Sequence, residues 1–367
     1  MVRAPIATHS ALIGQAPHAL LAVLLFLLAL LLPAEGAHAA PSPKKAIWGP
    51  VVRDGVDQFP IYRDLGVGIY EAKVSWAAVA RRRPAHPTNP ADPAYSWPSG
   101  IDQAVREAPG YGIAVSLLVM DSPRWANGGR GPQFAPPNPH DYSKFIQAAA
   151  RHYPAVHHWM IWGEPTKPSD FEPQGRAGAR LYARILDAAY GRLKAISRRN
   201  LVIGGDTYTV GATPPLRFVR MLRLPSGRPP RMDLYGHNPF SAREPRFGQS
   251  PLGGGSVDFS DLPLLERAVN RQLARPRHKR RLRLFLSEFT LPTDHTNFEF
   301  NFYLTRAVQA RWLGDALRIT RRTSWIYTLG YLALYDDALR PDGQQVERGL
   351  LDRQGLPKPA FAVYRRG

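Results

Sequence analysis

The sequence predicts a single (β/α)8 barrel, an α/β fold in which eight parallel strands alternate with helices. Short apolar runs alternate eight times with amphipathic runs from residue 45 to the C-terminus, and no linker-like or low-complexity segment divides them. The competing fold is an open, doubly wound sheet. Such a sheet usually carries a G-x-G-x-x-G turn after its first strand, whereas residues 47–55 read IWGPVVRDG.

The expected strands are short and apolar, as in IAVSLLVM at residues 113–120, and the expected helices are amphipathic. We expect strands at residues 45–51, 67–76, 113–120, 156–165, 200–208, 232–240, 282–289 and 324–336. We expect helices at residues 59–66, 97–112 (which ends on a glycine), 138–154, 176–197, 214–222, 260–274, 301–320 and 359–366. The proline-rich stretches 81–98 and 129–139 then become long loops that follow strands.

Residues 1–39 have the pattern of a secretory signal peptide. The uncharged run ALLAVLLFLLALLL follows Arg3 and precedes AEGAHAA, which offers an A-x-A cleavage site near Ala39. An uncleaved membrane anchor is the alternative, although the run is short for a span of about 20 residues. We therefore expect a secreted, extracellular protein, with residues 40–46 as a short lead-in and residues 47–367 as the barrel.

The composition excludes some chemistry and restricts the partners. With no cysteine, the chain has neither disulfides nor thiolate metal and redox sites. Its net charge of +19 is compatible with nucleic acid or acidic polymers as partners. The arginines are scattered, however, and the densest run, RPRHKRRLR at 275–283, leads into a strand and is typical of a solvated loop. We expect no nucleic-acid partner; electrostatic association with an anionic cell envelope is compatible with the charge.

Two carboxylates close otherwise apolar strands, which is the end of a barrel where catalytic groups lie. Glu164 ends WMIWGEP on strand four, and Glu288 lies in LRLFLSEF on strand seven. Burying a carboxylate costs several kcal/mol unless it is paired or used. The tips of these strands face each other across the mouth, and two carboxyls about 5 to 5.5 Å apart suit a retaining glycosidase. The aromatic surround of Trp159 and Trp162 would raise the pKa of the acid.

Other polar and aromatic residues near the strand ends are candidates for substrate binding. They are Lys73, Asp121, Asp206, Tyr235, His237, Asn238 and Tyr327, with Trp125 and Trp325 as sugar-stacking candidates. His237 or Lys73 could keep a nucleophilic carboxylate ionised, but a lone histidine is often a core residue and Asp often caps a helix. We expect no metal at HYPAVHHW, because His157 and His158 point to opposite faces of a strand.

Several motifs together resemble the clan A glycoside hydrolases, above all the cellulase-like and the xylosidase- or arabinosidase-like members. These motifs are SW at 75–76, SPRWA at 122–126, IWGEP at 161–165, LSEF at 286–289 and GLLDRQGLPKPAFAVY at 349–364. The resemblance covers the chain from Trp48 to its C-terminus. It implies a cofactor-free double displacement on a carbohydrate, with Glu164 as acid/base and Glu288 as nucleophile, in what we expect to be a monomer.

The chain departs from the family pattern at three places. Gly163 stands where the clan has an Asn that binds the sugar 2-hydroxyl, Glu71 stands where an Arg is expected, and HNPF at 237–240 replaces His-x-Tyr. Asn238 is the candidate substitute for the missing Asn. The alternative function is a catalytically impaired barrel that binds carbohydrate or serves the envelope, although a pure binder has no need of two facing carboxylates. The sugar stays open among glucan, xylan, arabinan and uronic-acid polymers.

Overall fold

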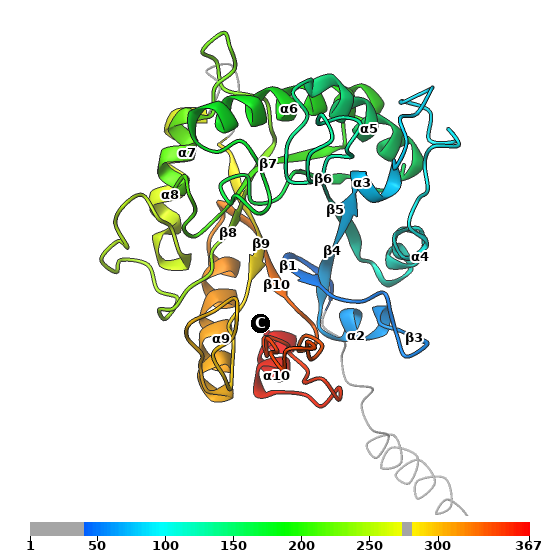
Figure 1. Ribbon diagram of the computed structural model, residues 1–367. Coiled ribbons are helices and arrows are strands. Elements are labelled where there is room, and N and C mark those ends of the chain that lie inside the picture. The colour runs from blue at the N-terminus through cyan, green and yellow to red at the C-terminus, as the bar shows by residue number, and fades with distance from the viewer. Residues whose placement is uncertain (1–39, 274–280) are drawn as a thin grey trace, which may run out of the picture. The chain divides into compact units, whose positions relative to one another are not determined.

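Eight parallel strands close into a barrel in the computed structural model, which describes residues 40–273 and 281–367. They are β1 (Ser42–Trp48), β4 (Val67–Ser75), β5 (Ala114–Met120), β6 (His158–Ile161), β7 (Leu201–Tyr208), β8 (Leu234–Asn238), β9 (Arg283–Phe289) and β10 (Ile326–Leu332). Each strand pairs with the next, and β1 pairs with both β4 and β10 (Figure 1). The prediction of a (β/α)8 barrel is confirmed.

Helices surround the barrel at each place where the sequence predicts one (Figure 1). They are α2 (Phe59–Asp64), α4 (Ser99–Glu107), α5 (Pro139–His152), α6 (Gly175–Ile196), α7 (Pro215–Met221), α8 (Leu262–Leu273), α9 (Arg306–Arg322) and α10 (Pro359–Arg366). Shorter elements that the sequence did not predict are β2 (Val52–Arg53), β3 (Val56–Asp57) and α3 (Trp76–Val79). The 3-10 turns Ala108–Tyr111 and Phe259–Asp261 adjoin α4 and α8 and overlap the helices predicted at 97–112 and 260–274.

The first strand begins inside the expected lead-in, because Ser42 already pairs with Val67 and Lys45 pairs with Leu329. The expected signal peptide, residues 1–39, lies outside the described residues. Among the helices that are described, none combines the length and the apolar character that crossing a membrane would need.

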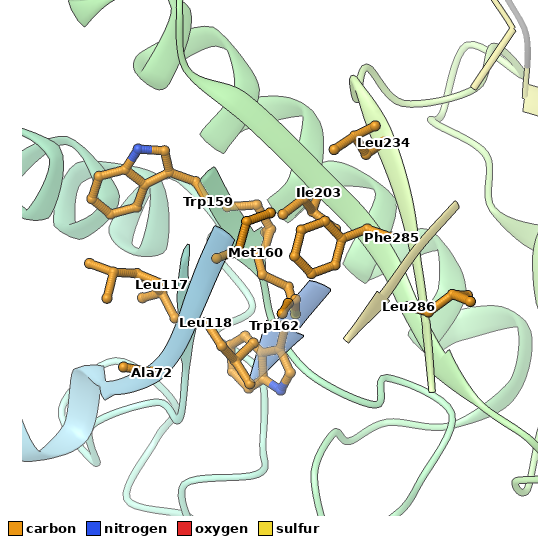
Figure 2. Packing of buried hydrophobic residues seen from close by; sticks show 14 of the residues in the cluster. Ala72, Leu117, Leu118, Trp159, Met160, Trp162, Ile203, Leu234, Phe285 and Leu286 are labelled. Atoms are coloured by element: carbon orange, nitrogen blue, oxygen red, sulfur yellow. The ribbon is translucent and has the colours of Figure 1, made fainter. Parts of the chain in front are cut away.

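Alternate residues of the strands fill the barrel and the layer between the barrel and the helices. At the amino end of the barrel, His158 Nε2 lies 2.8 Å from Tyr327 Oη, and the Tyr327 ring stacks on Phe285. Met160 points toward Phe285, whereas Trp159, one residue earlier, points the opposite way (Figure 2). Trp159 is fully buried, and its indole NH donates to the Val156 carbonyl at 3.1 Å. The apolar strand four is therefore packed on both faces.

Two strands carry an extra residue near their carboxyl ends. On β7, three steps from Gly204 to Thr207 face two steps on β8. On β9, three steps from Leu286 to Phe289 face two steps on β10. Such β-bulges re-aim the side chains around them. The bulge on β7 contains Asp206, and the bulge on β9 contains Glu288.

Two element boundaries differ from the prediction for local reasons. Strand β6 ends at Ile161 rather than 165, because Trp162 and Glu164 adopt left-handed conformations with φ of 62° and 44°. Helix α9 begins at Arg306 rather than 301, because the Thr305 hydroxyl accepts a hydrogen bond from Val308 N at 3.3 Å and caps it. Residues 301–305 therefore remain in a loop.

Candidate active site

A cavity of about 750 Å³ opens at the carboxyl end of the barrel, and both Glu164 and Glu288 line it. Its walls come from the segments that follow β6, β7, β8, β9 and β10. The aromatic lining consists of Tyr208, Phe240, Phe298, Phe300 and Phe302. The charged lining consists of Lys167, Arg243, Asp258, Glu299, Asp337 and Arg348, besides the two glutamates. A concave site that combines aromatic walls with a few converging polar groups is typical of ligand binding.

Glu164 lies on the tight turn after β6, where its backbone NH donates to the Asp206 carbonyl at 3.0 Å. Its side chain is only 8% exposed, and both carboxylate oxygens have a donor. Asn238 Nδ2 donates to Oε1 at 3.0 Å, and Lys167 Nζ donates to Oε2 at 2.9 Å. Burial raises the pKa of Glu164, while Lys167 and Asn238 act in the opposite direction, and the net pKa is above the usual range. The carboxylate is held in one position by these two donors.

Glu288 faces Glu164 from the bulge on β9 and is partly exposed to the cavity. Burial, and then the Glu164 charge, raise its pKa to about 8, although Lys167 and Arg348 lower it. Two carboxyls this strongly coupled titrate as a pair, so the pair keeps one proton near neutral pH. Lys167 and Asn238 stabilise the Glu164 carboxylate, which favours holding that proton on Glu288 in the unliganded site.

Asn238 connects the two glutamates. Its Nδ2 donates to Glu164, and its Oδ1 accepts a hydrogen bond from the Glu288 backbone NH at 3.1 Å. The side chain is fully buried at the end of β8. These two contacts hold the Glu164 side chain in a fixed position relative to the Glu288 backbone.

Asp206 is buried deeper in the same cluster, at 1% exposure. Gly236 leaves room for it, because a Cβ added there would lie 2.9 Å from Asp206 Oδ1, whereas one added to Gly163 would make an ordinary contact with Oδ2 at 3.5 Å. Neither oxygen has a hydrogen-bond partner among the described residues. Burial, then the charges of Glu288 and Glu164, raise the pKa of Asp206 well above its usual range. Burial and the two neighbouring carboxylates thus favour the neutral, protonated form of Asp206.

Glu71 is the fourth acid of the cluster and is also enclosed by the barrel. Its Oε2 accepts a hydrogen bond from Ser287 Oγ at 2.8 Å, and Oε1 has no partner in the described chain. Burial raises its pKa well above the usual range, and Asp206 and Glu288 add to this. Four carboxyls thus converge at the centre of a chain whose net charge is +19.

The structure brings together Glu164, Glu288, Asn238 and Asp206 of the predicted site residues. Lys73 and Asp121 form an ion pair of 3.0 Å at the ends of β4 and β5, outside the lining of the cavity. The Trp125 indole NH donates to the Ala80 carbonyl at 2.7 Å, and this half-buried ring packs edge-on against Trp76.

Four further candidates lie away from the cavity. His237 and Tyr235 alternate with Asn238 along β8 and are fully buried on its other face. His237 Nε2 donates to the Val257 carbonyl at 3.0 Å, so Nδ1 accepts a hydrogen bond from the Thr207 hydroxyl. Burial lowers the pKa of His237 to about 4. Trp325 and Tyr327 lie at the opposite end of the barrel, because β10 begins at Ile326 and ends at Leu332.

The histidine-rich stretch HYPAVHHW, residues 152–159, places His157 and His158 in two different environments. His157 Nδ1 lies 3.1 Å from Asn200 Oδ1, whereas His158 contacts Tyr327 inside the barrel. Across residues 40–273 and 281–367, no group of three or more His, Asp or Glu side chains is arranged to hold a metal ion.

Sequence reasoning missed Lys167, Arg348 and the aromatic lining. Lys167 lies three residues after Glu164, which becomes informative only once these residues are known to form a turn. The aromatic alternation FEFNFY at 298–303 was partly assigned to a helix, and the cap at Thr305 shows that it precedes that helix. Arg348 stands directly before GLLD and forms an ion pair of 2.9 Å with Glu299.

Comparison with solved structures identifies the architecture. A family 39 glycoside hydrolase from the gut symbiont Bacteroides cellulosilyticus WH2 superposes with a TM-score of 0.66 at 18% sequence identity, covering 89% of this chain and 63% of that one. The chain has the fold of a family 39 glycoside hydrolase. No protein-family model matches the sequence, and no curated protein matches it.

Two further glycosidase structures show the same barrel. A glucosidase from Croceicoccus marinus has a TM-score of 0.63 at 13% identity, covering 89% of this chain and 67% of that one. A family 39 β-xylosidase from Caulobacter crescentus has a TM-score of 0.57 at 17% identity, covering 89% and 72%. The chain therefore spans about two thirds of the length of these glycosidases and is a divergent form of their fold.

We expect Asp206→Asn to stabilise the protein at pH 8 by about 1 to 3 kcal/mol. The folded-state pKa of Asp206 is raised, so the wild-type protein loses stability as pH rises above the unfolded value of about 3.9. The gain should therefore shrink toward pH 4. Denaturant unfolding at both pH values checks this.

Asp54→Asn is the matched control, because Asp54 is exposed and also has a positive φ, 50°. It should leave stability nearly unchanged at both pH values. An equal gain for Asp206→Asn at pH 4 and pH 8 would mean that Asp206 is not a buried acid with a raised pKa.

Proposed function

We propose that the protein is an exported retaining O-glycoside hydrolase in which Glu164 is the acid/base and Glu288 the nucleophile. The observation that carries the proposal is that both carboxyls line one cavity at the carboxyl end of a family 39-like barrel; their raised pKa values, which favour one retained proton near neutral pH, support it. A carboxyl pair with one proton supplies both the acid and the nucleophile that a double displacement needs.

The reaction would proceed in two steps. In the first, the Glu288 carboxylate attacks the anomeric carbon while Glu164 gives its proton to the glycosidic oxygen, whose bond to that carbon breaks. In the second, the Glu164 carboxylate takes a proton from water, whose oxygen attacks the anomeric carbon and releases Glu288. Both glutamates return to their starting states.

The first step requires the shared proton on Glu164 when a glycoside is bound. In the unliganded site Lys167 opposes this, since its ammonium lies 2.9 Å from Glu164 Oε2. The Lys167 side chain is 44% exposed and also pairs with Asp170 at 3.4 Å. We infer that the bound leaving group displaces Lys167 toward Asp170, which allows the proton to move from Glu288 to Glu164.

Aromatic rings form one wall of the cavity and suit the apolar C–H face of a sugar. Phe300 packs against Phe240, with ring centroids 5.9 Å apart, and against Phe302, with centroids 5.8 Å apart. Phe298 is 47% exposed beside them. These rings, rather than the predicted Trp125 and Trp325, are our proposed stacking surface.

A catalytically impaired, carbohydrate-binding barrel is the second candidate. It is favoured by one observation: both oxygens of Glu164 are already occupied by donors in the free site. Turnover of aryl glycosides decides between the two candidates. If the wild-type protein hydrolyses none of a broad panel of aryl glycosides, the hydrolase proposal is wrong.

Azide rescue tests the roles of the two glutamates. With the best aryl glycoside, Glu288→Gly should be inactive, and azide should restore turnover to a glycosyl azide of inverted anomeric configuration. Glu164→Gly should lose about 10²- to 10⁴-fold on substrates with poor leaving groups, and azide should give a product of retained configuration. NMR of the products identifies the anomer. Exchanged outcomes for the two variants would reverse the assigned roles.

The pH dependence of kcat/KM tests the shared proton. We expect a bell-shaped profile whose alkaline limb lies near pH 8, because the pair loses its proton there. Lys167→Met removes a cation that favours ionisation of both glutamates, so both limbs should move to higher pH, by about one unit for the acid limb. Lys194→Met removes a lysine that pairs with Asp233 outside the cavity and should leave both limbs in place.

Export rests on residues 1–39 and is tested at the N-terminus. Expression in a bacterial host with a general secretion pathway should release a protein that begins near Ala40 or Pro41, as measured by mass spectrometry of the culture medium. Intact protein that begins at Met1 and fractionates with membranes would instead support an uncleaved anchor.

A further inference from the structure

A second hollow, of about 430 Å³, lies on the outer surface where α6 and α7 run side by side (Figure 1). Five arginines line it: Arg176, Arg180, Arg217, Arg220 and Arg223. No acidic side chain belongs to its lining. The hollow is therefore a concentrated positive charge on a concave surface.

Four of these arginines are exposed, and the described chain neutralises none of them. Arg176 and Arg180 are four residues apart on α6, and Arg217 and Arg220 are three apart on α7, so each pair repels across one face of its helix. Arg223 is tied to Gln272 by a hydrogen bond of 2.7 Å, which adds no negative charge.

Several other arginines of the described chain are paired with carboxylates. Arg231 makes a two-pronged contact with Asp187, and Arg243 makes one with Asp258. The arginines of the hollow differ from these by having no such partner in the described residues. Guanidinium groups bind carboxylate, sulfate and phosphate oxygens through paired NH donors, so an anion would offset the repulsion in the hollow.

Hydrogen bonds connect a loop that borders the hollow with loops that border the catalytic cavity. Thr166, two residues after Glu164, accepts a hydrogen bond at its carbonyl from Ala212 N at 3.0 Å. Thr213 Oγ1 in turn accepts from Gly175 N at 3.2 Å, and Gly175 lines the hollow. The loop of Ala212 and Thr213 also contributes Thr209 and Val210 to the lining of the cavity. A polymer that leaves the cavity over this loop would meet the arginines.

We propose that the hollow is a distal binding site for an anionic polysaccharide, whose carboxylate or sulfate groups the arginines hold while the chain enters the cavity. The hydrogen-bonded loops that connect the hollow with the catalytic cavity favour a glycan over a nucleic acid, and the concave shape favours a single chain over a flat membrane surface. The choice of a glycan rests on the proposed hydrolase function, whereas binding of an anion at this place does not.

Direct binding tests the proposal without turnover. In a Glu288→Gln background, affinity for polygalacturonate and for dextran sulfate is measured by affinity electrophoresis at fixed salt, with neutral dextran as reference. The variant Arg176→Gln/Arg180→Gln/Arg217→Gln/Arg220→Gln should bind the anionic polymers at least roughly tenfold more weakly. Comparison of the two polymers distinguishes carboxylate from sulfate recognition.

The matched control is Arg81→Gln/Arg82→Gln/Arg267→Gln/Arg271→Gln, which removes the same four charges from exposed positions outside the hollow. It should retain most of the affinity. Thermal unfolding shows that both variants are folded. If the quadruple variant does not fold, Arg176→Gln/Arg180→Gln is compared with Arg81→Gln/Arg82→Gln.

Three results would overturn the proposal: equal losses for the variant and its control, equal binding of neutral dextran, or tighter binding of a single-stranded oligonucleotide through the same arginines. Binding that depends on the hollow in a protein that hydrolyses no glycoside would support the site and refute the hydrolase. Hydrolysis of small aryl glycosides with no binding at the hollow would support the hydrolase and refute the distal site.

Discussion

The contact of Asn238 with both glutamates is the interaction on which the site depends. A carboxyl pair can share a proton only if its members are held at a fixed separation, and charged side chains left to themselves would move toward solvent. Asn238 prevents this by donating to the Glu164 side chain and accepting from the Glu288 backbone. Because Asn238 ends a barrel strand and is fully buried, the barrel itself sets the position of both acids.

Backbone geometry that is unfavourable in isolation aims the acids inward. Glu164 and Asp206 have positive φ values of 44° and 41°, each costing about 1 to 3 kcal/mol. Glu288 lies within a bulge. Such conformations persist only where the surrounding structure enforces them, and here a closed ring of parallel strands does so. The stability of the barrel core is thus used to hold the strained ends of its strands.

The sequence was informative about the barrel and about Glu164 and Glu288, because strand and helix periodicities differ and because an acid after an apolar run is unusual. It was less informative about which of two neighbouring residues on a strand points toward the site. His237 and Asn238 are neighbours, yet only Asn238 contacts the two glutamates, since successive residues of a strand point to opposite faces. Trp325 was placed at the wrong end of the barrel, because an apolar run does not show where pairing starts. The positions of Lys167 and of the aromatic lining depend on loop conformations, which the spacing of apolar residues in the sequence does not predict.

The pair of glycines around Asp206 has a consequence for how this barrel can change. A Cβ at position 236 would lie 2.9 Å from both Asp206 Cα and Asp206 Oδ1, so any side chain there competes with Asp206 for the same volume. A Cβ at position 163 would make only an ordinary contact with Asp206 Oδ2, at 3.5 Å, but would lie 3.2 Å from Leu118 Cδ2. A side chain introduced at 163 therefore requires a small shift of Leu118, whereas one introduced at 236 requires Asp206 itself to move.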